Sequence, residues 1–227
     1  MTTALLTGAS RGIGRATALA LARRGVALSL LGRPSEGLAR AVAELREAGT
    51  SVATFPCDLA SAEAVQSAMK AALEASGTPD CVLNIAGVAE RRQVRDLDPQ
   101  SFDRQLAVNL RAPFLITRAV LPGMLARRTG RIVHVASISS TLGTAGQSAY
   151  NASKWALVGF MKSLAEELRD TGLMTVALLP GSVATDMLCD SGFPARMGPQ
   201  DVARSLVYYA LEAPLAHNGG VIEMFGV

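Results

Sequence analysis

Residues that bind metals or form disulfides are scarce in this sequence of 227 residues. The two histidines, His134 and His217, have no cluster of thiols or carboxylates near them in the chain, so we expect no metal site. The three cysteines, Cys57, Cys81 and Cys189, lie far apart and form no C-x-x-C pair. We therefore expect buried, reduced thiols rather than a disulfide or metal ligands.

Long apolar runs and an excess of charge are also missing. Although 49% of the residues are hydrophobic, no uninterrupted apolar run reaches the roughly 18 to 20 residues that span a membrane. The first predicted strand begins at residue 4, which leaves no room for a signal peptide and predicts a cytoplasmic protein. The net charge is only +3, and Lys and Arg form no block interleaved with aromatic residues. We therefore expect neither a membrane protein nor a nucleic-acid-binding protein.

Short apolar runs alternate with longer amphipathic segments, the pattern of repeated strand–helix units around a parallel sheet. We expect strands at 4–7, 27–31, 51–55, 81–84, 131–135, 175–179 and 221–225. We expect helices at 12–24, 36–48, 61–76, 99–127, 150–170 and 199–211. Because no linker, repeat or change of composition interrupts this pattern, it predicts one α/β domain over residues 1–227.

Three glycines punctuate the turn between the first strand and the first helix. Gly8 suits a tight turn, Gly12 allows the backbone to approach a diphosphate, and Gly14 allows the helix to pack closely on the strand. The amino end of the following helix supplies amide donors for an anion. The turn therefore predicts a dinucleotide site, although glycines are common enough here for such spacing to occur by chance.

Tyr150 and Lys154 are four residues apart in a predicted helix, so both side chains point from one face into one site. An ammonium roughly 4 Å from a half-buried phenol favours the phenolate by about 4 kcal/mol, or about three pKa units. That lowering would suit an acid–base group at neutral pH. Ser137, after a predicted strand, is placed to donate a hydrogen bond to a substrate oxygen. By itself the Tyr–Lys spacing could also be accidental.

The G-x-x-x-G-x-G turn, Ser137 and Tyr150-x-x-x-Lys154 together resemble the short-chain dehydrogenase/reductase family. The resemblance extends from Thr7 to the last strand and implies a single-domain Rossmann fold, a doubly wound parallel seven-stranded sheet with helices on both faces. Further segments match in order: Asp58-Leu59, Asn84-Ile85-Ala86-Gly87, Asn109, and Pro180-Gly181-Ser182-Val183-Ala184-Thr185. Ile85 departs from the family pattern, which has a second Asn there.

The resemblance implies roles for these residues. The cofactor would be held by Gly8, Ser10, Arg11, Gly12, Ile13, Gly14, Arg33, Asp58, Leu59, Asn84, Ala86, Gly87, Tyr150, Lys154, Pro180, Gly181, Val183 and Thr185. Taken singly, Asp58 could be a helix cap, Asn109 an ordinary polar helix residue, and Pro180-Gly181 a plain turn. Only their joint occurrence supports the assignment.

The end of the second strand predicts NADP(H) as the cofactor. NAD-binding proteins place an acidic residue there, which pairs with the ribose hydroxyl and repels a phosphate. This chain has Gly32 followed by Arg33, whose guanidinium suits a phosphate, and Arg11 could close the other side. The alternative is that Arg33 is a solvated loop residue.

The resemblance also implies the chemistry, hydride transfer between the nicotinamide and a carbonyl carbon. Ser137 would bind the carbonyl oxygen and Tyr150 would deliver the proton. Lys154 would lower the pKa of Tyr150 and bind the nicotinamide ribose, and Asn109 would hold a water that restores the proton. A non-catalytic NADP-binding sensor or scaffold is a further alternative, although such proteins usually lack one of the three residues.

The substrate is less clearly indicated. Gln147, three residues before Tyr150, resembles 3-oxoacyl-thioester reductases, which predicts a 3-oxoacyl group on acyl carrier protein or coenzyme A. A predicted lid over 187–198 is short and apolar, which leaves an open cleft for a long substrate unless its Met and Phe residues only pack. Arg127, Arg128, Arg131 and Arg169 could meet an acidic carrier protein, or could form a solvated surface. Another ketone or secondary alcohol is the alternative substrate.

The helix that begins at Tyr150 is apolar on more than one side, so it lies deep in a core or also faces a partner. Together with the resemblance, this predicts a homodimer or homotetramer packed through the fifth and sixth helices.

Overall fold

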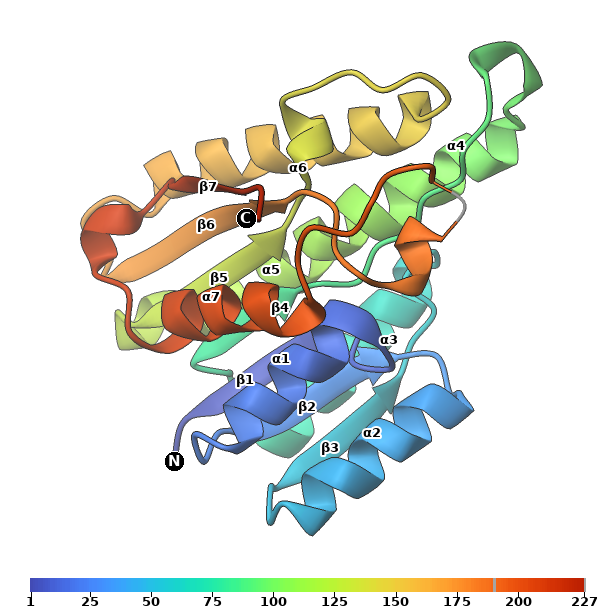
Figure 1. Cartoon of the computed structure of the whole chain (residues 1–227). Helices are drawn as coiled ribbons and strands as arrows, with labels where there is room; N and C mark the ends of the chain where they lie inside the picture. The colour runs from blue at the N-terminus through green and yellow to red at the C-terminus, as the bar shows by residue number, and fades with distance from the viewer. Residues whose placement is uncertain (190, 227) are drawn as a thin grey trace.

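A parallel sheet with helices on both faces forms the molecule (Figure 1). The computed structural model describes residues 1–189 and 191–226. Residue 190, within the predicted lid, and residue 227, at the end of the predicted domain, lie outside the described residues. In the described part the strands are β1 (Thr3–Thr7), β2 (Ala27–Gly32), β3 (Val52–Pro56), β4 (Cys81–Asn84), β5 (Gly130–Val135), β6 (Leu173–Pro180) and β7 (Val221–Met224). The predicted seven-stranded Rossmann fold is confirmed.

The strand order is β3-β2-β1-β4-β5-β6-β7, and every neighbouring pair is parallel. The chain builds outward from β1 to β3, and then crosses back to place β4 on the other side of β1. In sheets of this type a ligand binds beyond the carboxyl ends of the strands, where the order reverses. The topology therefore places the expected site between the ends of β1 and β4.

Helices cover both faces of the sheet. Their bounds are α1 (Gly12–Ala22), α2 (Glu36–Glu47), α3 (Ala62–Ser76), α4 (Pro99–Leu106), α5 (Ala112–Arg127), α6 (Ser148–Glu167) and α7 (Pro199–Leu211). In Figure 1, α1, α2 and α7 lie on the near face, and α3 and α5 lie behind the sheet. None of the helices in the described residues is long and apolar enough to cross a membrane.

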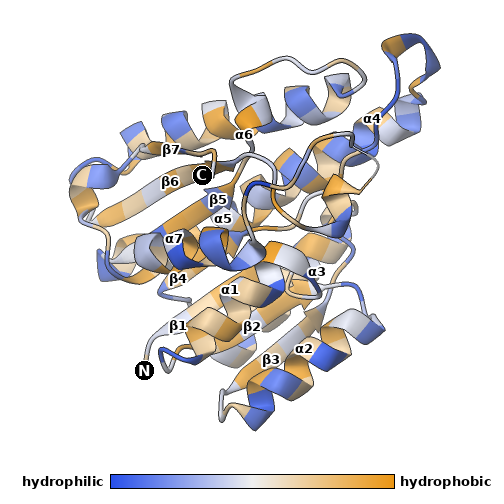
Figure 2. Cartoon of the chain, in the orientation of Figure 1, coloured by the Kyte–Doolittle hydropathy of each residue, from blue (hydrophilic) through white to orange (hydrophobic). Residues whose placement is uncertain are grey.

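Alternate residues of β1 belong to hydrophobic cores on opposite faces of the sheet. In β1, Ala4 and Leu6 pack with α1, α2 and α7, whereas Leu5 packs with α3 and α5. All three are at most 1% exposed, because a strand covered on both faces has no solvent side. Figure 2 shows the same pattern, with hydrophobic strands inside and hydrophilic residues on the outer helix surfaces.

The predicted helix over 99–127 is wrong as a single element. The structure divides it into α4, a π-helical turn η2 (Ala107–Arg111) and α5. Pro113 has no N–H, so it cannot donate the ordinary α-helical hydrogen bond to the carbonyl of Asn109, four residues earlier. The change of winding therefore falls on a predicted site residue, which is where π turns are often found.

The cysteine prediction is partly wrong. Cys57 and Cys81 are buried and free, as expected, but Cys189 is exposed. Burial raises the pKa of the Cys57 thiol to about 11 and that of Cys81 to about 12, with neighbouring carboxylates adding to the effect. Both buried thiols are therefore inert structural groups at neutral pH.

Candidate active site

A cleft of about 880 Å³ lies along the carboxyl edge of the sheet, beside the reversal of strand order. Nearly all the predicted site residues line it: Gly8, Ser10, Arg11, Gly12, Ile13, Gly14, Arg33, Asp58, Leu59, Ala86, Gly87, Ser137, Gln147, Tyr150, Lys154, Pro180, Gly181, Val183 and Thr185. Asn84 and Asn109 lie just behind its wall. Residues from six strand ends thus converge on one space.

The glycine turn has the conformation that its residues require. Gly8 has φ +81°, and Gly12 has φ +53°, values that other residues adopt only with strain. A Cβ on Gly14 would lie 2.0 Å from the carbonyl oxygen of Gly8, which no side chain could tolerate. The predicted close packing of the first helix on the turn is therefore confirmed.

The amino end of α1 fits an anion. Its capping residue, Arg11, makes no side-chain hydrogen bond to the helix, and the first turn has no acidic residue. The exposed amide groups of Gly12 and Ile13 consequently lack a side-chain acceptor and carry the positive end of the helix dipole toward the cleft. This end of the cleft accommodates the diphosphate of a dinucleotide.

The end of β2 fits a phosphate rather than a bare ribose. Gly32 and the exposed Arg33 line the cleft, and a Cβ on Gly32 would meet nothing within 4 Å. The space for an acidic side chain therefore exists, but the sequence has no acidic residue there and places the guanidinium of Arg33 at the next position. Arg11 also lines the cleft, and its exposed guanidinium pairs with Asp186 at 2.9 Å, so that its place on the other side of a phosphate stays a prediction.

Asp58 and Leu59 follow β3 and line the cleft. The carboxylate of Asp58 accepts a hydrogen bond from the Ala60 amide at 3.1 Å, which fixes a turn. Ser61 is the residue that caps α3, since its hydroxyl accepts from the Ala64 amide. The alternative reading of Asp58 as a helix cap is therefore wrong.

The loop after β4 is held against β1 by Thr7, which the sequence analysis did not single out. The Thr7 hydroxyl accepts hydrogen bonds from the amides of Ile85 and Ala86, both at 3.1 Å. A Cβ on the next residue, Gly87, would lie 3.4 Å from both Asn109 Oδ1 and Lys154 Nζ. The loop therefore passes directly over both side chains, close enough for a side chain at position 87 to contact them.

Asn84 faces inward rather than into the cleft. It pairs across the sheet with His134, and its amide lies 3.3 Å from Nδ1 of that ring. Burial, reinforced by the charge of Lys154, lowers the pKa of His134 to about 3. The ring is neutral at physiological pH, so Lys154 faces no charged histidine. Among the described residues, no group of His, Cys, Asp or Glu is arranged to hold a metal ion.

Asn109 is fully buried in the η2 turn and clamps the loop after β4. Its side chain accepts from the Val88 amide and donates to the Val88 carbonyl, both at 2.9 Å, and donates to the Ser153 hydroxyl at 2.9 Å. Both N–H groups of the Asn109 amide and one lone pair of its oxygen are bound to buried partners, so the interpretation of Asn109 as an ordinary polar helix residue is wrong. It ties the cleft wall to α6.

Ser137, Tyr150 and Lys154 share one wall of the cleft. Ser137 begins the short helix η3 (Ile138–Ser140) after β5, and the other two lie one turn apart on α6. All three are at most 8% exposed. Lys154 Nζ donates to the Val135 carbonyl at 2.8 Å and lies 5.8 Å from the centre of the Tyr150 ring. The predicted convergence of these side chains is present.

The predicted lowering of the Tyr150 pKa by Lys154 is not found in this geometry. Burial raises the pKa of Tyr150, while a hydrogen bond with Ser137 and the positive charge of Arg91 act in the opposite direction. Burial also lowers the pKa of Lys154 to about 8. The phenol is therefore protonated at neutral pH, and the charge that stabilises its ionised form comes from Arg91, which the sequence analysis did not identify.

The segment after β6 closes the cleft from above. The Gly181 amide donates to the Met224 carbonyl at 2.8 Å, and Val183 is bridged to Met197, which is buried. Met197 is therefore a packing residue, whereas Met187 and Phe193 are exposed on the cleft side. The predicted apolar lid over an open cleft is partly supported.

Known proteins resemble this chain over nearly its whole length. A family model described as short chain dehydrogenase matches residues 2–192. A 3-oxoacyl-[acyl-carrier-protein] reductase of Synechocystis is 34% identical over 96% of this chain and 92% of its own. Oxidoreductase UcpA of Salmonella typhimurium is 34% identical over 98% of this chain and 84% of its own. The solved structure of a 3-oxoacyl (acyl-carrier-protein) reductase of Agrobacterium tumefaciens with NADP bound has a TM-score of 0.91 and 28% identity, covering 99% and 93% of the two chains.

Proposed function

Because this chain belongs to the short-chain dehydrogenase/reductase family, we propose that it reduces a ketone carbonyl with NADPH, in first place that of a 3-oxoacyl thioester. The chain is an oxidoreductase, and its cofactor is NADP(H). The observation that carries the proposed reaction is the convergence of Ser137, Tyr150 and Lys154 on one wall of the cleft. The relatives named as 3-oxoacyl reductases support the thioester.

NADP(H), when bound, supplies or accepts the hydride. Tyr150 acts as the acid in reduction, since burial keeps its phenol protonated until the substrate oxygen gains charge. Ser137 donates a hydrogen bond to that oxygen and fixes its position. The phenolate left behind is stabilised by the positive charge of Arg91 and by the hydrogen bond with Ser137.

Six parts of the cleft wall would hold the cofactor in this proposal. The amides at the start of α1 would bind the diphosphate, Arg33 the 2′-phosphate, and Asp58 with Leu59 the adenine. Lys154 would bind the nicotinamide ribose, and Gly87 and the Pro180–Thr185 segment would contact the nicotinamide. Asn109 holds a water that returns the proton to the site.

Gln147 supports the thioester proposal, because its buried side chain lines the cleft one helical turn before Tyr150. The four arginines considered for a carrier protein give less support. Arg127 and Arg128 donate to carbonyls of this chain, and Arg131 donates to Ala213. They lie at the amino end of the sheet, whereas the cleft is at the carboxyl end. These arginines therefore give no support to a carrier protein bound beside the cleft, and we place the acyl carrier protein second to a free thioester.

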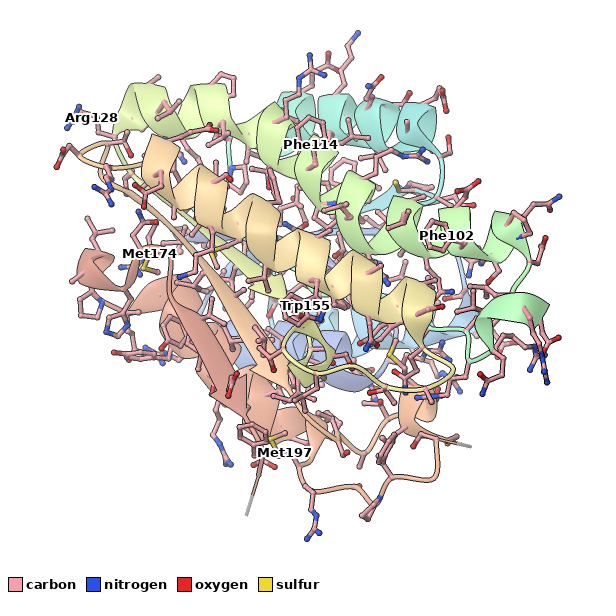
Figure 3. All side chains as sticks on the ribbon, turned by 90° about the horizontal axis from the view of Figure 1, so that it is seen from above. Phe102, Phe114, Arg128, Trp155, Met174 and Met197 are labelled. Atoms are coloured by element: carbon pink, nitrogen blue, oxygen red, sulfur yellow. The ribbon has the colours of Figure 1, made fainter. Side chains whose placement is uncertain are left out.

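We also propose that the protein is a homodimer or homotetramer. Three exposed aromatic side chains lie on the surface formed by α4, α5 and α6, namely Phe102, Phe114 and Trp155 (Figure 3). Phe114 packs edge-on against Phe160 of α6, beside a groove of about 570 Å³. An apolar patch of this kind supports contact with a second copy. The cytoplasmic location expected from the sequence stays a prediction.

The experiment measures NADPH oxidation with 3-oxoacyl thioesters of different chain length and with plain ketones. Tyr150→Phe should lower kcat by about a hundredfold to ten-thousandfold, because the proton donor is removed, and leave the Kd of NADPH within about twofold. Tyr208→Phe, an exposed tyrosine outside the cleft, is the matched control and should match the wild type. Full activity in Tyr150→Phe would contradict the mechanism, and a kcat/KM higher with NADH than with NADPH would contradict the assigned role of Arg33.

A further inference from the structure

Arg91 projects from the loop after β4 into the cleft wall that also contains Ser137, Gln147 and Tyr150. One terminal nitrogen donates to the Met187 carbonyl of the lid at 3.0 Å. Its Nε is buried and has no hydrogen-bond partner among the residues that the structure describes. A guanidinium has five N–H donors, so most of this one's donating capacity is left for something else in the cleft.

The backbone on both sides of Arg91 is fixed. The Glu90 amide donates to the side chain of buried Gln105 at 3.1 Å, and the Arg92 amide donates to the Gly146 carbonyl at 2.8 Å. Gly146 immediately precedes Gln147, so the loop is pinned beside the segment that leads to the tyrosine. Arg91 is therefore held in place before any substrate binds, which reduces the entropy lost on binding.

The charges around Arg91 do not neutralise it. In residues 1–189 and 191–226, no acidic side chain forms an ion pair with Arg91. The adjacent Glu90 turns away, because it binds Ser101 and Arg92, and Asp186 pairs with Arg11. The other charged groups on the substrate side of the cleft, Arg104 and Lys154, are also cationic. A cleft wall with this positive charge favours a substrate that places an oxygen atom with partial or full negative charge beside it.

We propose that Arg91 binds a second oxygen group of the substrate, carried close to the carbonyl that is reduced. A 3-oxoacyl thioester supplies this group as its thioester carbonyl, and a 3-oxo acid supplies it as a carboxylate. A plain ketone supplies neither. The inference rests on the proposed ketone reduction and narrows it to substrates with two neighbouring oxygen functions.

The test compares three methyl ketones: 3-oxobutanoate, its N-acetylcysteamine thioester, and 2-pentanone. The wild type should prefer one or both of the first two over 2-pentanone by more than about tenfold in kcat/KM, because a charged hydrogen bond is lost with the plain ketone. Arg91→Met should lower kcat/KM for the preferred substrate by about tenfold to a hundredfold. It should change kcat/KM for 2-pentanone by less than about twofold. A larger loss with the acid identifies a carboxylate, and a larger loss with the thioester identifies a neutral acyl group.

Arg92→Met is the matched control, since Arg92 is exposed, lies outside the cleft and pairs with Glu90. It should keep the wild-type preference. Equal losses on all three ketones in Arg91→Met would mean that Arg91 only holds the lid through Met187, and would overturn the proposal. No loss on any of them would overturn it too.

A binding measurement separates this inference from the proposed function. 3-Hydroxybutanoate, already reduced, cannot react with the NADPH-loaded protein, and its Kd can be measured by calorimetry. Arg91→Met should raise that Kd at least about tenfold, and Arg92→Met should leave it unchanged. If no ketone is reduced but this difference in Kd is seen, ketone reduction fails and the role of Arg91 stands. If ketones are reduced and neither Kd nor preference depends on Arg91, only the inference fails.

Discussion

Lys154 is a charged residue that the fold buries with a single polar partner, the carbonyl of Val135. Removing an ammonium from water is unfavourable, and one neutral hydrogen bond does not offset it. Burial accordingly lowers its pKa from 10.5 to about 8. Burying the ammonium here lowers the stability of the folded chain. We infer that a lysine occupies this position because of its function in the cleft.

Lys154→Met should change how stability depends on pH. Below pH 8 the wild-type ammonium is charged in both folded and unfolded chains, and its burial weakens the fold. Between pH 8 and 10.5 the folded chain releases the proton first. Over this range the free energy of unfolding of the wild type should therefore rise by up to about 3 kcal/mol relative to that of the variant. Denaturant unfolding of both proteins at several pH values measures this difference.

The difference between the two proteins, rather than the absolute stability, is the informative quantity, because the variant also leaves the Val135 carbonyl without its donor at every pH. Lys162→Met, at an exposed position on the same helix, should leave the pH dependence of the wild type unchanged. If the free energies of unfolding of the wild type and Lys154→Met differed by the same amount at every pH, the ammonium would not be buried as described.

At the level of elements, the junction of β1 and α1 depends on the absence of one side chain. A methyl group at Gly14 would meet the carbonyl of Gly8 at 2.0 Å, and both are backbone positions that cannot turn aside. Helix α1 would have to move away from the turn, and its amino end would move with it.

Gly14→Ala should therefore lower the free energy of unfolding by about 1 to 3 kcal/mol and weaken NADPH binding. Denaturant titration and a direct measurement of the NADPH Kd would show both effects. Gly143→Ala is the control, because its added Cβ lies in a loop and meets nothing within 4 Å. Its free energy of unfolding should stay within about 0.5 kcal/mol of the wild-type value. Unchanged NADPH binding in Gly14→Ala would mean that the position of α1 does not govern the cofactor site.

The interruption between α4 and α5 shows what an element-level pattern misses. The sequence has apolar and polar residues spaced for one continuous helix, and Pro99 and Pro122 are accommodated within this region. At the π turn Pro113 provides no backbone donor, and the side chain of Asn109 binds Val88 and Ser153. Those partners are 21 and 44 residues away, so the periodicity of the segment could not indicate them.

On the scale of the whole molecule, the apolar face formed by α4, α5 and α6 determines how copies associate in the proposed oligomer. Phe114 is 42% exposed and Trp155 is 53% exposed, large values for aromatic residues on neighbouring helices. Burying them against a second copy would contribute about 25 cal/mol for each Å² of apolar surface removed from water.

The double variant Phe114→Glu, Trp155→Glu should convert the protein to a species of one subunit mass, 23.6 kDa, because each copy would place uncompensated charges in the contact. Light scattering at micromolar concentration measures the mass. Leu215→Glu, at an exposed apolar residue away from this face, should leave the wild-type mass unchanged. A wild-type mass of one subunit would contradict the proposed oligomer.

Much of the fold was predictable, because the strands are mostly short apolar runs. Their alternation with amphipathic helices is typical of a parallel sheet covered by helices. The glycine turn was predictable for a related reason, since its backbone excludes other residues. The expected direction of the Tyr150 pKa was wrong, because burial and the actual partner of the ammonium depend on packing. Thr7 and Arg91 were missed, since neither carries a local signal of its contacts.

The sequence by itself determined the order of the elements, the glycine turn and the set of polar residues at the strand ends, because these follow from local backbone preferences and from the periodicity of apolar residues. Only the tertiary structure decided which of those residues meet. The return of the chain from β3 to β4 brings Arg91 to Tyr150, and the packing of α6 turns Lys154 toward Val135. Contacts between segments far apart in the chain depend on the whole packed arrangement, and no local stretch of sequence specifies them.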